Sequence, residues 1–344
     1  MINRRHLALG ASAFAGLNFA NAALAATPFA PPAGPRARVV YINDMSGDID
    51  GLFATVHMLL SPSVDVRAIV GTGTNMPQGI SATETAQHSA ELAQEMLRLM
   101  RRNAPVFVGA PGRLTDLATP VRSPGTQAII EEAMRTDSNL PLYVAVGGGL
   151  TEVASALIIE PRIADKFVLI WIGGDPYPAG GAEYNHNIDP LAAQLVFNQS
   201  NVVIWQVPSS VYALCPVSDT EMQAYVAPMG AIGAWLYQKV IDTSTRIGQG
   251  RYALNTGESW TLGDSPLVLL TALTSWVPSG GSAHGFLYQR TGGSAYDDII
   301  APRLGPGGVY QAQTSGRHIR VYRSVDTRLM FGDFFAKLRV NSGR

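Results

Sequence analysis

The chain has 344 residues, 47% of them hydrophobic, and a formal net charge of −1 at pH 7. This composition is typical of a globular protein with a sizeable core, and it lacks the basic excess that nucleic-acid binding requires, so no nucleic-acid partner is expected. The single cysteine, Cys215, excludes an intrachain disulfide and a cysteine-based zinc site.

Residues 1–25 have the features of an export signal. A basic start precedes an Ala-rich apolar stretch and the small-residue pattern Ala-Leu-Ala at 23–25. The arginine pair at positions 4 and 5 resembles that of a twin-arginine signal, although the rest of that consensus is only partly met. The alternative is an uncleaved membrane anchor, but the apolar stretch is short for a span and interrupted by small residues. We predict cleavage near Ala25, no stable anchor afterwards, and a periplasmic or secreted mature protein.

After a Pro-rich lead-in over 26–37, β-branched runs alternate with helical patterns through one predicted domain, 38–340. We expect strands at Ala37–Ile42, Val64–Val70, Pro105–Val108, Leu142–Val146, Phe167–Ile172, Asn201–Val207 and Arg320–Tyr322. We expect helices at Ile49–Leu60, Ser81–Arg101, Thr126–Arg135, Thr151–Ile159, Pro190–Asn198, Ser218–Ala227, Ile232–Thr243 and Ser265–Thr274. This alternation predicts a single α/β domain, with a mostly parallel central sheet flanked by helices around a Rossmann-like core.

Three acids, Asp44, Asp48 and Asp50, follow the first predicted strand within seven positions. An acid here could cap the next helix, lie in a surface turn or form an ion pair. Capping needs only one acid, however, and leaves Asp44 unexplained. Parallel sheets bind ligands at the carboxyl ends of their strands, and crowded carboxylates are costly unless a cation or polar ligand lies between them. Oxygen ligands of this kind suit Ca²⁺.

The segment NDMSGDIDGLFA resembles the N-terminal Asp cluster of the inosine-uridine-preferring nucleoside hydrolases. The family's longer consensus, DTDMGNDVDDALAL, aligns without a gap and matches Asp44, Asp48 and Asp50, but Ile42 and Gly51 stand where the family has Asp. In the shorter consensus, DTDPGxDDALAL, Asp48 takes the first position of the Asp pair and an isoleucine takes the second. In either register one carboxylate of the family's adjacent Asp pair is missing.

Two further segments match the family's calcium ligands. VAVGGGLTEVASAL is similar to LGPLTNIALAL and places Thr151 at a threonine whose carbonyl oxygen binds calcium. LGDSPLVLLTAL resembles HDPLAVA and places Asp264 at a calcium-binding Asp.

Two more segments match the family's sugar site. GGAEYNHNIDPLAAQLVF is similar to VAEFNIxxDPEAAxxVF and places Glu183 and Asn185 at residues that bind ribose hydroxyls. TGTNM places Asn75 at the asparagine of the family's AGN loop. The resemblance covers about Arg38 to Leu338.

This resemblance implies an exported hydrolase that cleaves the N-glycosidic bond of a ribonucleoside with water activated by Ca²⁺. It implies that Asp44 is both a calcium ligand and the general base. Asp50 would hold a ribose hydroxyl, and the calcium would be shared with Asp48 or Asp50, Thr151 and Asp264. A missing anionic ligand would weaken Ca²⁺ binding.

The second departure from the family is Gly263, which replaces a His that lies near the leaving base. His186 is the nearest candidate for a general acid, the alternative being a solvent-facing or structural imidazole. Trp260, Trp235 and Tyr237 could stack a purine, or pack in the core.

Because of Gly51 and Gly263, two further hypotheses stay open. One is a family member without turnover that binds a nucleoside or sugar, and the other is a hydrolase of a different N-riboside. Family members form dimers or tetramers, so the resemblance also implies a homo-oligomer.

Overall fold

The computed structural model describes residues 34–74, 81–250, 255, 257–274 and 294–342. The predicted signal at 1–25, most of the lead-in, and Asn75 lie outside these described residues. None of the helices in the described part is long and apolar enough to cross a membrane.

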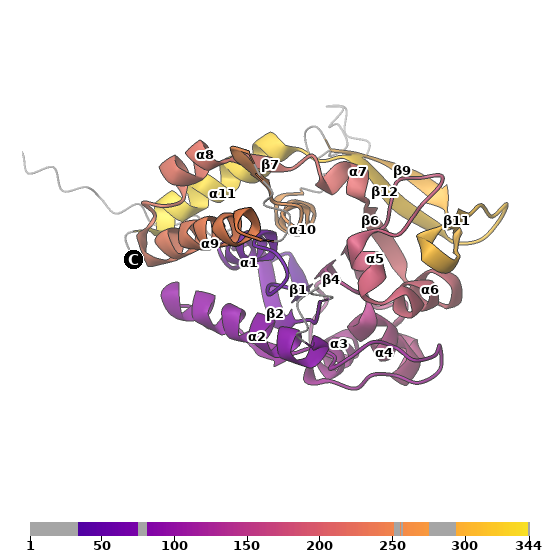
Figure 1. Ribbon diagram of the computed structural model, residues 1–344. Helices are drawn as coiled ribbons and strands as arrows, with labels where there is room; N and C mark the ends of the chain where they lie inside the picture. The colour runs from indigo at the N-terminus through magenta and orange to yellow at the C-terminus, as the bar shows by residue number, and fades with distance from the viewer. Residues whose placement is uncertain (1–33, 75–80, 251–254, 256, 275–293, 343–344) are drawn as a thin grey trace, which may run out of the picture.

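An eight-stranded sheet forms the centre of the molecule (Figure 1). Its strands, in spatial order, are β3 (Val106–Val108), β2 (Val64–Gly71), β1 (Ala37–Asn43), β4 (Leu142–Gly147), β5 (Val168–Ile172), β6 (Val203–Val207), β12 (His318–Ser324) and β9 (Ala295–Ile300). All neighbours pair in parallel except β9, which runs antiparallel to β12 at the edge. The prediction of a single α/β domain with a mostly parallel sheet is confirmed.

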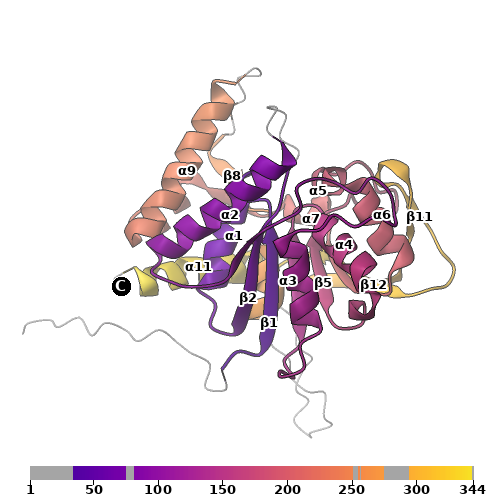
Figure 2. The ribbon, with the colours of Figure 1, turned by 90° about the horizontal axis from the view of Figure 1, so that it is seen from below.

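Helices cover both faces of this sheet because the inner strands are apolar on both sides (Figures 1 and 2). Along β1, Tyr41 packs in one buried cluster and Val40 in the other. Tyr41 shares its cluster with α1 (Asp50–Leu59), α2 (Ala82–Leu99), α10 (Pro266–Val268) and α11 (Thr327–Asn341). The Val40 cluster contains α3 (Pro124–Ala133), α4 (Thr151–Ile159) and α6 (Pro190–Gln199).

Other elements lie outside the central sheet. They are α5 (Tyr184–Ile188), α7 (Ser209–Tyr212), α8 (Asp219–Tyr225), α9 (Gly230–Gly248) and the two-stranded pairs β7 (Pro216–Ser218) with β8 (Ser259–Thr261) and β10 (Arg303–Leu304) with β11 (Tyr310–Gln311). Figure 2 shows α9 beside α2, which it contacts, with both extending beyond the sheet.

The seven predicted strands all lie in the central sheet, and the predicted helix over 151–159 has the observed bounds. The helix predicted over 265–274 is present as a continuous helical segment that begins as α10 and continues as a π-helix, Leu269–Leu273. The edge strand β9 and the short helices α5 and α7 were not predicted.

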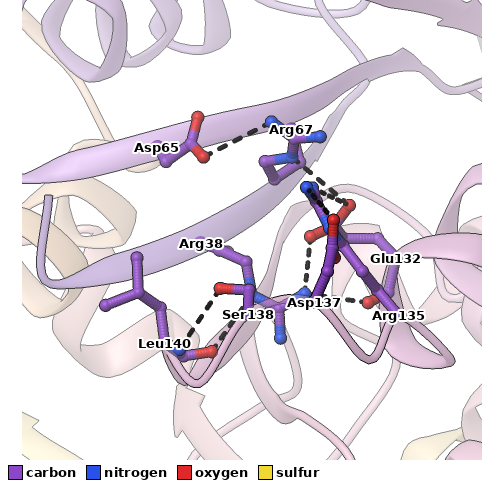
Figure 3. Close-up of polar contacts among 8 residues, drawn as sticks. All are labelled: Arg38, Asp65, Arg67, Glu132, Arg135, Asp137, Ser138 and Leu140. Carbon is purple, nitrogen blue, oxygen red and sulfur yellow. Dashed lines mark hydrogen bonds and ion pairs between the residues drawn. The ribbon is translucent and has the colours of Figure 1, made fainter.

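A buried ion pair ties the amino end of β1 to α3, at the edge of the sheet opposite the acids (Figure 3). Arg38 is 6% exposed, and its Nη1 donates to Glu132 Oε1 at 2.5 Å and to the Glu132 carbonyl at 3.0 Å. Arg67 on β2 donates to the other carboxylate oxygen, Oε2, at 3.3 Å. Glu132 therefore joins two strands to one helix.

Candidate active site

A cavity of about 430 Å³ opens at the carboxyl edge of the sheet, beside the ends of β1 and β5. Sheet order reverses at β1, because β2 and β3 lie on one side and β4 to β6 on the other. Such a reversal leaves a crevice in which open α/β sheets bind ligands. The residues lining the cavity are Asp44, Gly47, Asp48, Asp50, Ile172, Glu183, Tyr184, Asn185, Tyr212, Thr243, Arg246, Ile247, Trp260 and Asp264.

The four predicted aspartates all reach this cavity, although Asp264 is more than 200 positions away from the others in the chain. Asp50 accepts a hydrogen bond from its neighbour's amide, Gly51 N, at 2.8 Å, and from Asp264 N at 3.2 Å. Asp48 accepts one from Trp260 Nε1 at 3.2 Å. The hydrogen bond from the Asp264 backbone amide to the Asp50 carboxylate holds the first turn of α1 against the segment before α10.

Burial and mutual repulsion make these carboxyl groups weak acids. Burial, followed by the charges of Asp264 and Asp48, raises the pKa of Asp44 well above its ordinary value. Burial and the neighbouring carboxylates do the same to the pKa of Asp50. Burial raises the pKa of Asp264 to about 7. Arg246 is the only lysine or arginine among the described residues that line the cavity, so protein cations do not balance the acids.

Glu183 lines the cavity, but its carboxylate already accepts four hydrogen bonds. Oε1 accepts from Asn185 N at 3.0 Å and Tyr212 Oη at 2.8 Å, and Oε2 accepts from Gly174 N at 2.8 Å and His186 N at 2.9 Å. A carboxylate has about four lone-pair sites, so Glu183 must give up a donor before it can bind a ribose hydroxyl. Glu183 also caps α5, whose start it fixes.

Asn185 is better placed for a sugar hydroxyl. Its Nδ2 donates to Ile172 O at 2.9 Å, which fixes the side chain at the carboxyl end of β5. Because Asn185 lines the cavity and its Oδ1 is left to accept, it can bind a hydroxyl group without breaking this bond.

Two other predicted site residues are not among those that line this cavity. Thr151 is the first residue of α4; its hydroxyl donates to Asp189 Oδ2 at 2.8 Å, and it borders a separate small cavity with Thr72 and Thr74. His186 is 1% exposed and is not among the residues lining the main cavity, because it is on a buried side of α5 facing Gly308. Its position fits the structural alternative better than a general acid.

Of the three candidate aromatic residues, only Trp260 lines the cavity. Trp235 and Tyr237 pack against the core cluster of α1, α2 and α11, in agreement with the alternative that these residues pack in the core. Two other aromatic residues, Tyr212 and Tyr184, also line the cavity and were not predicted. Tyr212 follows β6 within five positions, so a search of the residues just after each strand could have found it.

The space beside Gly263 is partly taken by Tyr212. A Cβ atom at position 263 would lie 3.1 Å from Tyr212 Cδ2 and 3.2 Å from Asp50 Oδ2. A larger side chain at position 263 would therefore displace the Tyr212 ring. The ring lies next to the position at which the family consensus has a histidine.

Among the described residues, no group of three or more His, Cys, Asp or Glu side chains is arranged to hold a metal ion. The charges of the described aspartates raise one another's pKa values, but these residues do not form such a group. A cation bound between them would therefore need neutral oxygen ligands as well, which Ca²⁺ accepts readily.

Comparison with known proteins adds to this geometry. The family model described as "Inosine-uridine preferring nucleoside hydrolase" matches residues 40–327. Two proteins of that description are similar over shorter stretches: one from Leishmania major at 34% identity over 105 residues, and one from Crithidia fasciculata at 45% over 64 residues. These stretches are 29% and 17% of this chain, and only 32% and 19% of the two relatives' own lengths.

Solved structures agree on the fold. A purine-preferring ribonucleoside hydrolase from Gardnerella vaginalis superimposes with a TM-score of 0.63 at 16% identity, over 89% of this chain and 99% of that one. A nucleoside hydrolase from Bacillus anthracis gives a TM-score of 0.59 at 14% identity, over 88% of this chain and 99% of that one. With the family match covering most of the sequence, the chain belongs to the inosine-uridine preferring nucleoside hydrolase family.

Proposed function

We propose that this protein hydrolyses the N-glycosidic bond of ribonucleosides and releases a free base and ribose. The observation that carries the proposal is the one cavity in which Asp44, Asp50, Asn185 and Asp264 meet, since three separate segments of the chain contribute to it. Family membership supports the same reaction class.

The residues suit a reaction whose transition state carries positive charge on the sugar. Asp44 and Asp264, which are buried, and the half-buried Asp50 line the cavity, and carboxylates there stabilise an oxocarbenium-like ribosyl group. Asp44 serves as the general base that removes a proton from the attacking water.

The sugar is held by its hydroxyl groups. Asn185 accepts a hydrogen bond through Oδ1, and Asp50, which also lines the cavity, accepts a second one. Trp260, beside Asp48, offers an aromatic face to the base.

We further infer that the site works with Ca²⁺, which when bound supplies the positive charge that orients and acidifies the attacking water. The donor set fits in chemistry, since it is made of oxygens and includes a buried amide oxygen of Asn43 that has no hydrogen-bond partner among the described residues. Asp44 and Asp264 would hold the ion, with Asp48 or Asp50 and the Thr151 carbonyl as the remaining predicted ligands.

The decisive experiment is release of free base from a panel of purine and pyrimidine nucleosides, with Ca²⁺ and with a chelator. Asp44→Asn, which keeps the shape of the side chain, should abolish release while the protein remains folded. Full activity in that variant would refute the base assignment, and no release from any nucleoside would refute the proposed reaction.

The second candidate is a nucleoside-binding protein without turnover. It is favoured by Gly51 and by Gly263, beside which Tyr212 fills part of the space that a histidine would need. Binding of a nucleoside without release of base, measured by calorimetry on the same panel, would identify this case.

We also infer export of the mature protein to the periplasm or medium, from the pattern over 1–25. Cell fractionation with sequencing of the mature amino terminus tests it, the expected start being Ala26. Replacement of both arginines at positions 4 and 5 by lysine should block export if a twin-arginine route is used.

A further inference from the structure

Asn43 is the last residue of β1 and lies directly beside the acids of the site. Its side chain is fully buried, and Nδ2 donates to Asp264 Oδ2 at 2.7 Å. Oδ1 has no hydrogen-bond partner in the part of the chain that the structure describes. A buried amide oxygen without a partner costs free energy, so its retention next to a site needs an explanation.

Two glycines leave room for this amide. A Cβ atom at Gly51 would lie only 1.9 Å from Asn43 Oδ1, and one at Gly147 would lie 2.5 Å from Asn43 Nδ2. Neither position can therefore carry a side chain while Asn43 keeps its conformation. Gly51 is the position at which the family consensus has an aspartate, so Asn43 occupies the space from which that aspartate's side chain would extend.

The free oxygen has the chemistry of a metal ligand. The Asn43 amide is held in place through its nitrogen by Asp264, which leaves the oxygen to accept. Asn carbonyl oxygens are ordinary Ca²⁺ ligands, and a cation here needs neutral ligands because too few acidic side chains converge.

We propose that Asn43 Oδ1 is a ligand of the cation in this site and replaces the carboxylate that other family members carry at the position of Gly51. The inference rests on the proposed function for the presence of a cation. In this arrangement a ligand has moved from helix α1 to strand β1, and Asn43 also orients Asp264 through its nitrogen.

The test measures metal binding instead of turnover. Ca²⁺ affinity is determined by calorimetry on the full chain, and the number of water molecules on bound Tb³⁺, used as a stand-in for Ca²⁺, is taken from luminescence lifetimes in H₂O and D₂O. Asn43→Leu keeps the approximate shape and removes the oxygen, whereas Asn43→Asp keeps an oxygen at the same place. The matched control is Asn198→Leu, at an amide that in the described part of the chain bonds the backbone of Leu304.

We expect Asn43→Leu to weaken Ca²⁺ binding by about tenfold or more and to add about one water molecule to bound Tb³⁺. Asn43→Asp should bind Ca²⁺ at least as tightly as the wild type, with unchanged hydration, and Asn198→Leu should match the wild type. If Asn43→Leu does not fold, the hydration count of Asn43→Asp decides: an unchanged count supports the ligand, and an extra water molecule overturns it.

Wild-type affinity and hydration in a folded Asn43→Leu variant would overturn the proposal and leave Asn43 only as a residue that positions Asp264. Base release from a wild-type protein that binds no Ca²⁺ would also overturn it, while the proposed hydrolysis would stand. Ca²⁺ binding that depends on Asn43, without base release from any nucleoside, would support the ligand and refute the hydrolysis.

Discussion

Gly51→Ala puts one methyl group into a place that Asn43 already occupies. The new Cβ would lie 1.9 Å from Asn43 Oδ1, far inside van der Waals contact, so the amide has to rotate away. Rotation breaks the bond from Asn43 Nδ2 to the Asp264 carboxylate, and a hydrogen bond to a charged group contributes roughly 1.5–3 kcal/mol to the free energy of unfolding.

Other contributions partly offset one another. An off-rotamer side chain costs about 0.5–1.5 kcal/mol, while alanine in place of glycine in a helix gains at most about 1 kcal/mol. The net expectation is a loss of about 2–3 kcal/mol, which for a chain of this size lowers Tm by about 5 °C. Thermal and urea denaturation at constant pH measure it.

The matched control is Gly332→Ala in α11, where an added Cβ meets nothing within 4 Å. That variant should be neutral or slightly more stable. In an Asn43→Ala background, the cost of Gly51→Ala should largely disappear, because the amide that it displaces is gone. If Gly51→Ala is as harmless as Gly332→Ala, the proposed exclusion between positions 43 and 51 is wrong.

Three other variants test the fold and the site. Glu132→Ala removes the carboxylate that pairs with the buried Arg38 and should lower the free energy of unfolding in urea by about 3 kcal/mol. A loss below about 1 kcal/mol would show that the backbone carbonyl oxygens that also accept from Arg38 are enough to stabilise its charge. Burial lowers the pKa of His57 to about 4, below its unfolded value of about 6.5, so the free energy of unfolding falls by up to about 3 kcal/mol as pH drops from 6.5 to 4. His57→Gln should flatten this pH dependence, measured as Tm against pH. An unchanged slope would assign the pH dependence to other groups. Tyr212→Phe removes one of the four donors to Glu183 and should lower the free energy of unfolding by about 1–2 kcal/mol. Since the substitution frees a lone-pair site on the carboxylate, the KM for nucleosides should fall or stay level. A strong rise in KM would mean that the Tyr212 hydroxyl itself binds substrate.

The sequence was sufficient for the sheet because its inner strands are continuous apolar runs. Strand β5, VLIWI, is buried along nearly its whole length, and such a run between helical patterns predicts a parallel strand. Strand β9, AYDDII, could not be recognised in this way. It pairs on one side only and exposes both aspartates, so it carries little apolar signal.

Part of the site could also be predicted, for a different reason. Asp44, Asp48 and Asp50 are visible because they follow a strand, whereas Asp264 was found only through the family resemblance. Arg246 gave no signal at all: it lies near the end of the long helix α9, and only the packing of that helix beside α2 brings it to the cavity.

Gly51 shows most clearly what a linear comparison of sequences leaves out. Compared position by position, the glycine is a lost carboxylate, and position 43 has no visible connection with it. In the folded chain the two positions belong to adjacent elements, the end of β1 and the first turn of α1, and the Asn43 amide lies where the side chain of residue 51 would begin. The glycine is then required by the asparagine, so one substitution accounts for the other. A family member that lacks the aspartate is therefore better judged by the oxygens around the site than by the matched positions alone. Here the buried Asn43 amide, which donates to Asp264, has an oxygen with no hydrogen-bond partner among the residues that the structure describes.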